Sequence, residues 1–169
     1  MGCDMSFIKK AGLAASKKGE ERLDKRILLL GLDNAGKTSM LFQMRDNQFK
    51  QTVPTVGLNI EQINYKRYNM TLWDVGGQAT KLWKHYFDHI DAVVFVVDST
   101  DEDRLFLARD ELRKLLSSGP NATTASTSGS SESLGDVPFL LMYNKKDMVG
   151  LSKTSEELSG RLEIEALRE

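Results

Sequence analysis

The sequence of 169 residues has a single cysteine, Cys3, and only two histidines, His85 and His89. One cysteine cannot form an internal disulfide, and such sparing use of cysteine favours a reducing compartment. The cysteine and histidines lack metal-site spacing, and no serine, histidine and aspartate are arranged for nucleophilic catalysis. The sequence therefore argues against a disulfide-stapled domain, a zinc-type centre and a triad hydrolase, and we expect both histidines to be packing or surface residues.

Charge of one sign and long hydrophobic runs are also lacking. The formal net charge is −1, so no global electrostatic field attracts nucleic acid, and we expect no nucleic-acid partner. No apolar run is long enough to cross a bilayer. With 40% hydrophobic and 28% charged residues, the composition is that of an ordinary globular protein. The length suits one α/β domain, which we expect to be a monomer.

Four short apolar runs predict buried strands at residues 27–30, 70–73, 92–97 and 139–143. Amphipathic stretches that predict helices lie between them, at residues 39–44, 82–87 and 104–116. Alternating strands and helices predict an α/β fold with three layers, in which a mostly parallel sheet has helices on both faces. Ligands bind such sheets at the carboxyl ends of the strands, where this sequence has Asp74, Asp98 and Asn144.

Smaller signals predict the remaining local structure. Residues 60–68 alternate loosely, and we expect them to pair antiparallel with the strand at 70–73 through a turn near Tyr68-Asn69. A last helix is expected at residues 154–169. Two pairs of residues before helices have capping-box spacing, Ser99 with Glu102 and Thr154 with Glu157.

The most informative segment follows directly on the first predicted strand. Residues 31–38 read G-L-D-N-A-G-K-T, and an apolar helical pattern comes next. Glycines allow the tight turn, backbone N–H groups then converge on an anion, and the helix start adds partial positive charge. Lys37 can reach the β- and γ-phosphates of a nucleotide, and the hydroxyl of Thr38 can bind Mg²⁺. The residues predicted to hold the phosphates are Gly31, Leu32, Asp33, Asn34, Ala35, Gly36, Lys37, Thr38 and Ser39.

A second segment, D-V-G-G-Q at residues 74–78, follows another predicted strand. Asp74 can hold Mg²⁺ through a water, and the N–H of Gly77 can approach a γ-phosphate because no side chain obstructs it. Gln78 can then orient an attacking water for in-line displacement.

A third segment, N-K-K-D at residues 144–147, follows the fourth predicted strand. The carboxylate of Asp147 can accept from both N1–H and the exocyclic amine of guanine, whereas adenine would leave its charge unpaired. The stem of Lys145 can lie against the ring, and Asn144 can tie this loop to the phosphate-binding loop. The sequence thus predicts a nucleotide site that prefers guanine.

In this order, the motifs resemble those of the small GTPases of the Ras superfamily, and most of all the branch of the ADP-ribosylation factor (Arf) and Arf-like proteins. Trp73 before the aspartate and the double glycine before Gln78 are typical of this branch. The resemblance covers roughly residues 20–169 apart from a serine-rich segment. Its motifs are G-L-D-N-A-G-K-T, P-T-V-G-L-N-I-E (54–61), L-W-D-V-G-G-Q (72–78), L-W-K-H-Y-F (82–87), V-V-D-S-T-D (96–101) and N-K-K-D.

The resemblance implies GTP and GDP as ligands, Mg²⁺ as the metal and GTP hydrolysis as the reaction. Thr55 would be the first-switch threonine, which binds Mg²⁺ and senses the γ-phosphate. The implied catalytic residues are Gln78, Lys37 and Thr55, and the implied metal-holding residues are Thr38, Thr55 and, through a water, Asp74. Asn144, Lys145 and Asp147 would read the guanine.

The same resemblance implies a molecular switch, since loss of the γ-phosphate would release both Thr55 and Gly77. No arginine is evident near either switch, so we expect slow hydrolysis that a partner accelerates by supplying one. The implied partners are an exchange factor, a GTPase-activating protein and effectors.

The first residues, M-G-C-D-M-S, fit the pattern for N-myristoylation at Gly2, and Cys3 is a candidate for a second acylation. One acyl chain binds membranes only marginally, and a second chain or a basic patch strengthens binding. Such a patch is supplied by Lys9, Lys10, Lys17 and Lys18. We expect residues 1–19 to anchor a cytoplasmic protein reversibly to the Golgi or another endomembrane, with a role in vesicle or membrane trafficking.

Residues 20–169 would form the GTPase domain. Within it, residues 117–135 are rich in serine, threonine and glycine, which predicts a disordered surface insertion. The family pattern continues with a further strand, a loop that backs the guanine and a final long helix, and no counterpart is present before Glu169. We therefore expect a small GTPase fold that lacks its last strand and helix.

Two other functions stay open at this point. The chain could be a nucleotide-independent, partner-binding remnant of an Arf-like GTPase, or an ATP-using enzyme with a phosphate-binding loop. The N-K-K-D segment argues against ATP, and no second substrate site is visible in the sequence.

Overall fold

A computed structural model describes residues 22–78, 80–117 and 137–167 of the chain. The expected anchoring segment, and the serine-rich insertion after Ser117, lie outside these residues. The described part contains one five-stranded sheet with the order β2-β3-β1-β4-β5. All neighbouring strands run parallel except β2 and β3. The strands are β1 (Leu23–Leu30), β2 (Leu58–Tyr65), β3 (Tyr68–Val75), β4 (Ala92–Asp98) and β5 (Phe139–Asn144).

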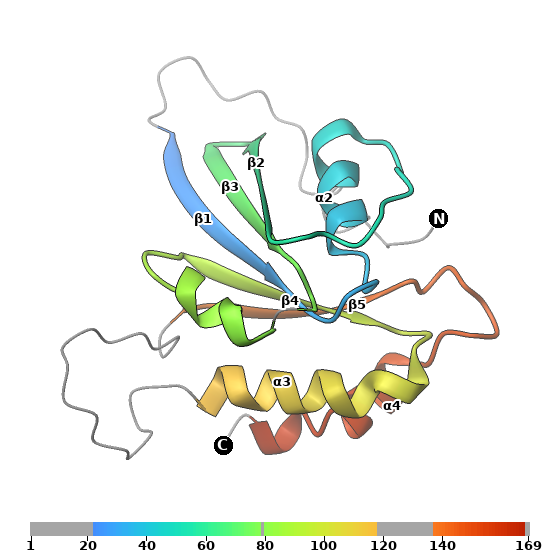
Figure 1. Ribbon diagram of the computed structural model, residues 1–169. Helices are drawn as coiled ribbons and strands as arrows, with labels where there is room; N and C mark the ends of the chain where they lie inside the picture. The colour runs from blue at the N-terminus through green and yellow to red at the C-terminus, as the bar shows by residue number, and fades with distance from the viewer. Residues whose placement is uncertain (1–21, 79, 118–136, 168–169) are drawn as a thin grey trace, which may run out of the picture.

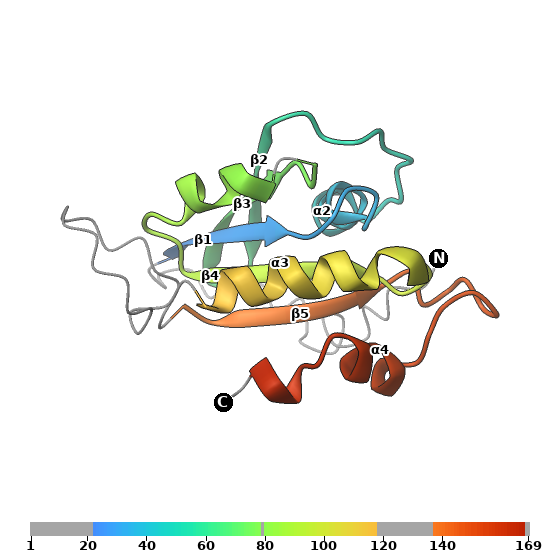
Figure 2. The same ribbon diagram turned by 60° about the horizontal axis from the view of Figure 1, so that its bottom comes forward.

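Helices cover both faces of the sheet, which confirms the predicted three layers (Figure 1). Helix α2 (Lys37–Asp46) packs on one face, over a core that includes Leu29, Leu41 and Leu72. The opposite face carries α3 (Leu105–Ser117), α4 (Ser155–Arg161) and the 3₁₀ helix η1 (Thr80–Tyr86), as the turned view in Figure 2 shows. Leucines 28 to 30 of β1 are fully buried, because successive side chains of this central strand point to opposite covered faces.

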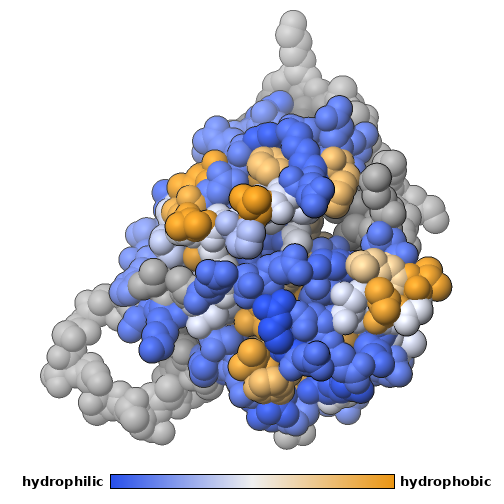
Figure 3. Space-filling model, turned by 45° about the vertical axis from the view of Figure 1, so that its right-hand side comes forward, coloured by the Kyte–Doolittle hydropathy of each residue, from blue (hydrophilic) through white to orange (hydrophobic). Residues whose placement is uncertain are grey.

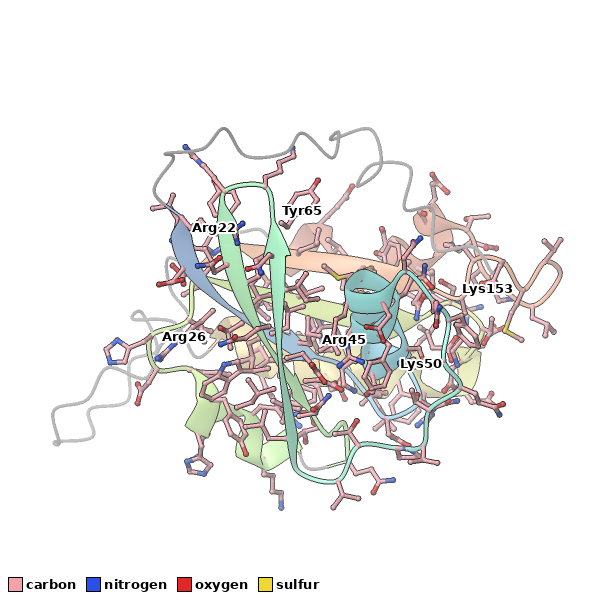
Figure 4. All side chains as sticks on the ribbon, turned by 90° about the horizontal axis from the view of Figure 1, so that it is seen from above. Arg22, Arg26, Arg45, Lys50, Tyr65 and Lys153 are labelled. Atoms are coloured by element: carbon pink, nitrogen blue, oxygen red, sulfur yellow. The ribbon has the colours of Figure 1, made fainter. Side chains whose placement is uncertain are left out.

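Helix α2 is fixed to the edge of the sheet at its carboxyl end. Arg45 forms an ion pair with Glu61 of β2 at 2.7 Å, and Lys50 pairs with Asp46 at 2.6 Å. Both cations also lie over the ring of Phe42, at 4.9 and 5.1 Å from its centroid. Figure 4 shows Arg45 and Lys50 close together between α2 and the segment that leads to β2. This docking sets the direction in which the chain leaves α2 toward β2.

The antiparallel pair of β2 and β3 was predicted correctly, but its turn was not. Tyr68 and Asn69 belong to β3, and the two-residue turn consists of Lys66 and Arg67, with Tyr65 opposite Tyr68. Lys66 takes the left-handed conformation, φ +52°, that such a tight connection requires. The amide of Asn69, which had suggested a turn, instead donates to Asp24 of β1 at 2.9 Å.

One predicted capping box is confirmed and the other is wrong. The hydroxyl of Thr154 accepts from the N–H of Glu157, and the Glu157 side chain accepts from the N–H of Thr154. Ser99 caps nothing: its buried hydroxyl has no hydrogen-bond partner among the described residues. A 3₁₀ turn, η2 (Glu102–Arg104), precedes α3 instead.

The single helix expected at residues 154–169 is also wrong. Helix α4 ends at Arg161, Glu163 has φ +55°, and a short 3₁₀ turn, η3 (Glu165–Leu167), follows. Arg109 and Arg113 of α3 both pair with the Glu163 carboxylate, which holds the chain at this break.

His85 and His89 are exposed, and the described residues contain no group of three or more histidine, cysteine or carboxylate side chains that could hold a metal ion. No helix in the described ranges is long and apolar enough to cross a membrane. The face in Figure 3 is mostly hydrophilic, with several separate hydrophobic patches.

Candidate functional site

The predicted phosphate loop connects β1 to α2 at the carboxyl edge of the sheet. Gly31 and Gly36 have φ values of +131° and +91°, which side chains rarely allow, and α2 begins at Lys37 directly after Gly36. The ammonium of Lys37 donates to the carbonyls of Gly31 at 2.8 Å and Leu32 at 2.9 Å. Lys37 therefore lies folded back along the loop that it is expected to serve.

Lys37 is only 5% exposed. Burial lowers its pKa from 10.5 to about 8, an effect that the nearby carboxylates of Asp74 and Asp33 partly oppose. Because little solvent reaches the Lys37 ammonium to screen its charge, an anion that enters the loop interacts with it strongly.

Three oxygen-bearing side chains meet beside the loop. The hydroxyl of Thr38 donates to Oδ2 of Asp74 at 2.5 Å and shares a hydrogen bond of 2.7 Å with the hydroxyl of Thr55. Asp74 is fully buried, and its Oδ1 has no hydrogen-bond partner among the described residues. Burial raises the pKa of Asp74, opposed first by the Thr38 hydrogen bond and then by the charge of Lys37. An all-oxygen donor set with an unsatisfied buried carboxylate oxygen fits Mg²⁺.

The double glycine after β3 lies against two other loops. The N–H of Gly76 donates to the carbonyl of Gly57 at 2.8 Å, which ties the loop after β3 to the segment before β2. A Cβ on Gly77 would lie 2.2 Å from the nitrogen of Asp33 and 2.3 Å from the carbonyl carbon of Leu32. Only glycine permits this approach, so the loop after β3, the segment before β2 and the predicted phosphate loop meet through their backbones.

The N-K-K-D segment begins at the last residue of β5 and lies beside the phosphate loop. The side-chain amide of Asn144 donates to the carbonyl of Ala35 at 2.8 Å, as the sequence predicts. The ammonium of Lys145 pairs with Asp98 at the end of β4, at 2.6 Å, and the backbone of Lys145 has φ +61°. Asp147 is exposed at the end of this segment.

These segments border one cavity of about 690 Å³. Eleven of the residues predicted to bind the nucleotide line it: Asp33, Asn34, Gly36, Lys37, Thr38, Ser39, Thr55, Gly77, Asn144, Lys145 and Asp147. The volume suits a ligand of nucleotide size.

Five predicted site residues do not line the cavity. Gly31, Leu32 and Ala35 act through their carbonyls, which accept from Lys37 and Asn144. Asp74 lies one contact away, behind Thr38. Gln78 is exposed next to Gly77 and is not brought to the cavity.

Sequence reasoning missed much of the cavity wall. The additional lining residues are Met40, Gln43, Asn47, Phe49, Gln51, Thr52, Val53, Pro54 and Met148. Most belong to the segment between α2 and Thr55, where Thr52 shares a hydrogen bond of 3.1 Å with Ser39. The sequence held one signal for them, their position: they form a non-periodic stretch between the helix after the predicted phosphate loop and Thr55, and both of its ends lie at the cavity.

Comparison with known proteins agrees with this geometry. The chain matches the ADP-ribosylation factor family over residues 13–169. It is similar to the Arl6 BBS3 small GTPase from Trypanosoma brucei, solved with the bound nucleotide analogue GppNp. That match has 35% sequence identity and a TM-score of 0.69, and covers 86% of this chain and 80% of the other.

A more distant likeness concerns the fold alone. The mammalian SRP receptor structure matches at 21% identity with a TM-score of 0.67, over 82% of this chain and 71% of the other. The family match, by contrast, spans most of the sequence and includes every segment that borders the cavity. On these grounds the chain belongs to the ADP-ribosylation factor family and has the small GTPase fold.

Proposed function

We propose that this protein is a guanine-nucleotide-dependent switch that binds GTP and GDP with Mg²⁺ and hydrolyses GTP slowly. One observation carries the proposal: a single cavity is bordered by the phosphate loop, by Thr55 and Gly77 of the two switches, and by the N-K-K-D segment. The other features that support it are the buried Lys37 and the converging oxygens of Thr38, Thr55 and Asp74.

In this proposal each group acts on a separate part of the nucleotide. The loop N–H groups and Lys37 bind the phosphates, and Asp147 accepts from the guanine edge while Lys145 lies along the ring. Thr38 and Thr55 would hold Mg²⁺, with Asp74 behind them. When bound, this ion neutralises phosphate charge and orients the phosphates.

The switch follows from what Thr55 and Gly77 share. Both line the phosphate end of the cavity, and their loops are joined by the hydrogen bond between Gly76 and Gly57. A γ-phosphate that contacts both loops stabilises this arrangement, and its departure removes the shared contact. Effectors that require the joined loops would then bind only the GTP form.

Slow hydrolysis follows from two features of the site. Gln78, the residue assigned to orient water, is exposed and must turn inward to act. No arginine is among the described residues that line the cavity. A partner that supplies an arginine would stabilise the transition-state charge, an effect on the order of 10³–10⁵ in rate.

The membrane part of the proposal rests on the N-terminal sequence. Acylation of Gly2, with Cys3 or the nearby lysines as a second signal, would recruit the protein reversibly to an endomembrane. There it would act as a monomer in membrane trafficking with an exchange factor, a GTPase-activating protein and effectors.

Nucleotide competition tests the central claim. A fluorescent GDP is bound to the purified chain and displaced by GTP or ATP, with Mg²⁺ and with excess chelator. We expect GTP to compete at least about a hundredfold better than ATP, and Mg²⁺ to slow release. Equal competition by GTP and ATP would favour an ATP-using enzyme. A chain that binds no fluorescent GDP and yet binds a protein partner would favour a nucleotide-independent binding remnant.

Two substitutions test the assigned roles. Gln78→Leu should slow single-turnover hydrolysis and spare nucleotide affinity, whereas Gln62→Leu, an exposed glutamine of β2, should change neither. Thr38→Asn should weaken Mg²⁺-dependent retention and favour GDP over GTP. Hydrolysis at the parent rate by Gln78→Leu would remove that residue from the mechanism.

A further inference from the structure

Arg104 contacts the predicted phosphate loop on the side away from the large cavity. It ends η2, directly before α3, and its Nη1 donates to Oδ1 of Asp33 at 3.0 Å. Its Nη2 donates to the main-chain carbonyl of the same residue at 3.4 Å. Its Nε donates to Oδ2 of Asp101 at 2.6 Å, which fixes the guanidinium in place. Arg104 thus contacts both the side chain and the backbone of one loop residue, 71 positions away in sequence.

The charge of Asp33 explains why such a contact matters. Asp33 lines the large cavity, close enough to Lys37 that its carboxylate influences the lysine. A carboxylate in this loop repels a polyphosphate unless a cation neutralises it. The side chains of Arg104 and Asp33 are 32% and 31% exposed, so solvent screens their pairing only in part.

Arg104 does not itself reach the large cavity. It lines a separate space of about 10 Å³ between the phosphate loop and α3, together with Asp33, Asp98 and Asp101. That space is too small for a metabolite, so it marks a packed contact and not a second ligand site. Arg104 can act on a nucleotide only through the loop.

We propose that Arg104 is a positioning residue for nucleotide binding, which acts through Asp33 to fix the phosphate loop and to cancel its negative charge. The same β4–α3 connection also contacts the base-recognition loop, because Asp98 pairs with Lys145 and the N–H of Ser99 donates to the carbonyl of Asn144. Figure 1 shows α3 starting from the sheet end that carries the phosphate loop. The inference rests on the proposed function and names a residue on which phosphate affinity depends.

The test compares two arginines of α3 and its start. Arg104→Gln removes the charge and keeps a planar polar end. Arg109→Gln is the matched control, because Arg109 is similarly exposed and pairs with Asp110 and Glu163, away from the loop. Affinities for GMP, GDP, GTP and inosine diphosphate are measured by displacement of fluorescent GDP at fixed salt and Mg²⁺.

Arg104→Gln should weaken GDP and GTP about tenfold, and GMP less, because the lost effect grows with phosphate charge. The ratio of GDP to inosine diphosphate affinity should stay unchanged, since the base contacts are not altered. Arg109→Gln should bind all four like the parent. In an Asp33→Asn background, adding Arg104→Gln should cost less than about twofold, because the charge that it neutralised is gone.

The inference is overturned if Arg104→Gln binds GDP like the parent, or if it loses no more affinity than Arg109→Gln. It is also overturned if the loss is the same in the Asp33→Asn background, or if base preference changes. A parent chain that binds no guanine nucleotide refutes the proposed function itself, whereas a binding parent with an unaffected Arg104→Gln variant refutes only this role.

Discussion

The residues at the two ends of the cavity differ in how deeply they are buried. At the phosphate end, Lys37 is 5% exposed, Asp74 is fully buried, and three loops contact through their backbones. At the base end, Asp147 is exposed, Met148 is 41% exposed, and Asn144 and Lys145 are half-buried. The first end emerges from β1 and β3, inside the sheet, whereas the second follows β5, which has no outer neighbour among the described strands.

Under the proposed function, this difference separates the groups that set affinity for phosphates from those that select the base. A charge that is buried before the ligand binds lowers the stability of the nucleotide-free protein. Bound phosphates offset this free-energy cost. The buried carboxylate at the base end, Asp98, is already paired with Lys145, and the other main tie of this end is the contact from Asn144 to Ala35. Substitutions at the phosphate end should therefore change affinity and stability in opposite directions, whereas substitutions at the base end should mainly change which base binds.

The largest expected effect is that of Lys37→Met. The variant loses the ammonium that is assigned to two phosphates, so affinity for GDP and GTP should fall on the order of a thousandfold. Removal of a buried cation should also make the chain more resistant to urea in the absence of nucleotide. Isothermal titration and urea unfolding check the two signs. If Lys37→Met lowered both the stability and the nucleotide affinity, the buried ammonium would not be a cost to the nucleotide-free chain, and this expectation would be wrong.

The pH dependence of stability should report the same lysine. Between pH 8 and 10.5 the unfolded chain keeps the Lys37 proton and the folded chain releases it, so the free energy of unfolding should rise with pH. The rise amounts to at most about 3 kcal/mol, and below pH 8 the full cost of the buried charge is present. Urea unfolding of nucleotide-stripped protein at pH 8 and 9.5 measures it. The parent and Lys37→Met are compared, and a rise of equal size in both would assign it to other groups.

Asp147→Asn should redirect base selection without a comparable change at the phosphates. An amide still accepts from N1–H but donates where guanine also donates, so it suits xanthine, which has a carbonyl there. We expect the affinity ratio of xanthosine to guanosine diphosphate to rise on the order of a hundredfold. Loss of affinity for both nucleotides, with the ratio unchanged, would mean that Asp147 does not read the base.

The smallest effect should come from Asp98→Asn, which removes the ionic partner of Lys145. The stem of Lys145 would still lie along the ring, so affinity should fall only about threefold. The loss should be equal for GMP, GDP and GTP, because no phosphate is involved. A loss that increased with the number of phosphates would show that the two ends are not separate.

The comparison also shows where sequence reasoning succeeds. The strands, their mostly parallel arrangement and the meeting of three distant motifs were predicted because apolar runs and loop motifs each depend on local residues. The tie from Asn144 to Ala35 followed from strand ends that share one edge of the sheet. Backbone reversals were harder to predict. Lys66 and Glu163 both have positive φ although neither is glycine or asparagine, so their residue types gave no sign of a reversal.

Contacts between loops and distant side chains were harder still. Arg104 was read only as the start of a helix, because nothing in a linear pattern shows that η2 faces the phosphate loop. The wall between Asn47 and Pro54 was missed for a similar reason, since its residues form no regular element and are placed by the docking of α2 on β2. Ser99 has the spacing of a cap, but the 3₁₀ turn that follows starts two residues too late for it.

The close contact of Gly77 with the backbone of Leu32 and Asp33 leaves no room for a side chain between the two loops. A methyl group at this position would overlap that backbone, so we expect an alanine variant to populate conformations in which the loop after β3 has moved away from residues 31–33. Such a variant would isolate the withdrawn form for study without any change of ligand. The same steric limit means that no side chain, however conservative, can replace the hydrogen of this glycine while the loops remain closed.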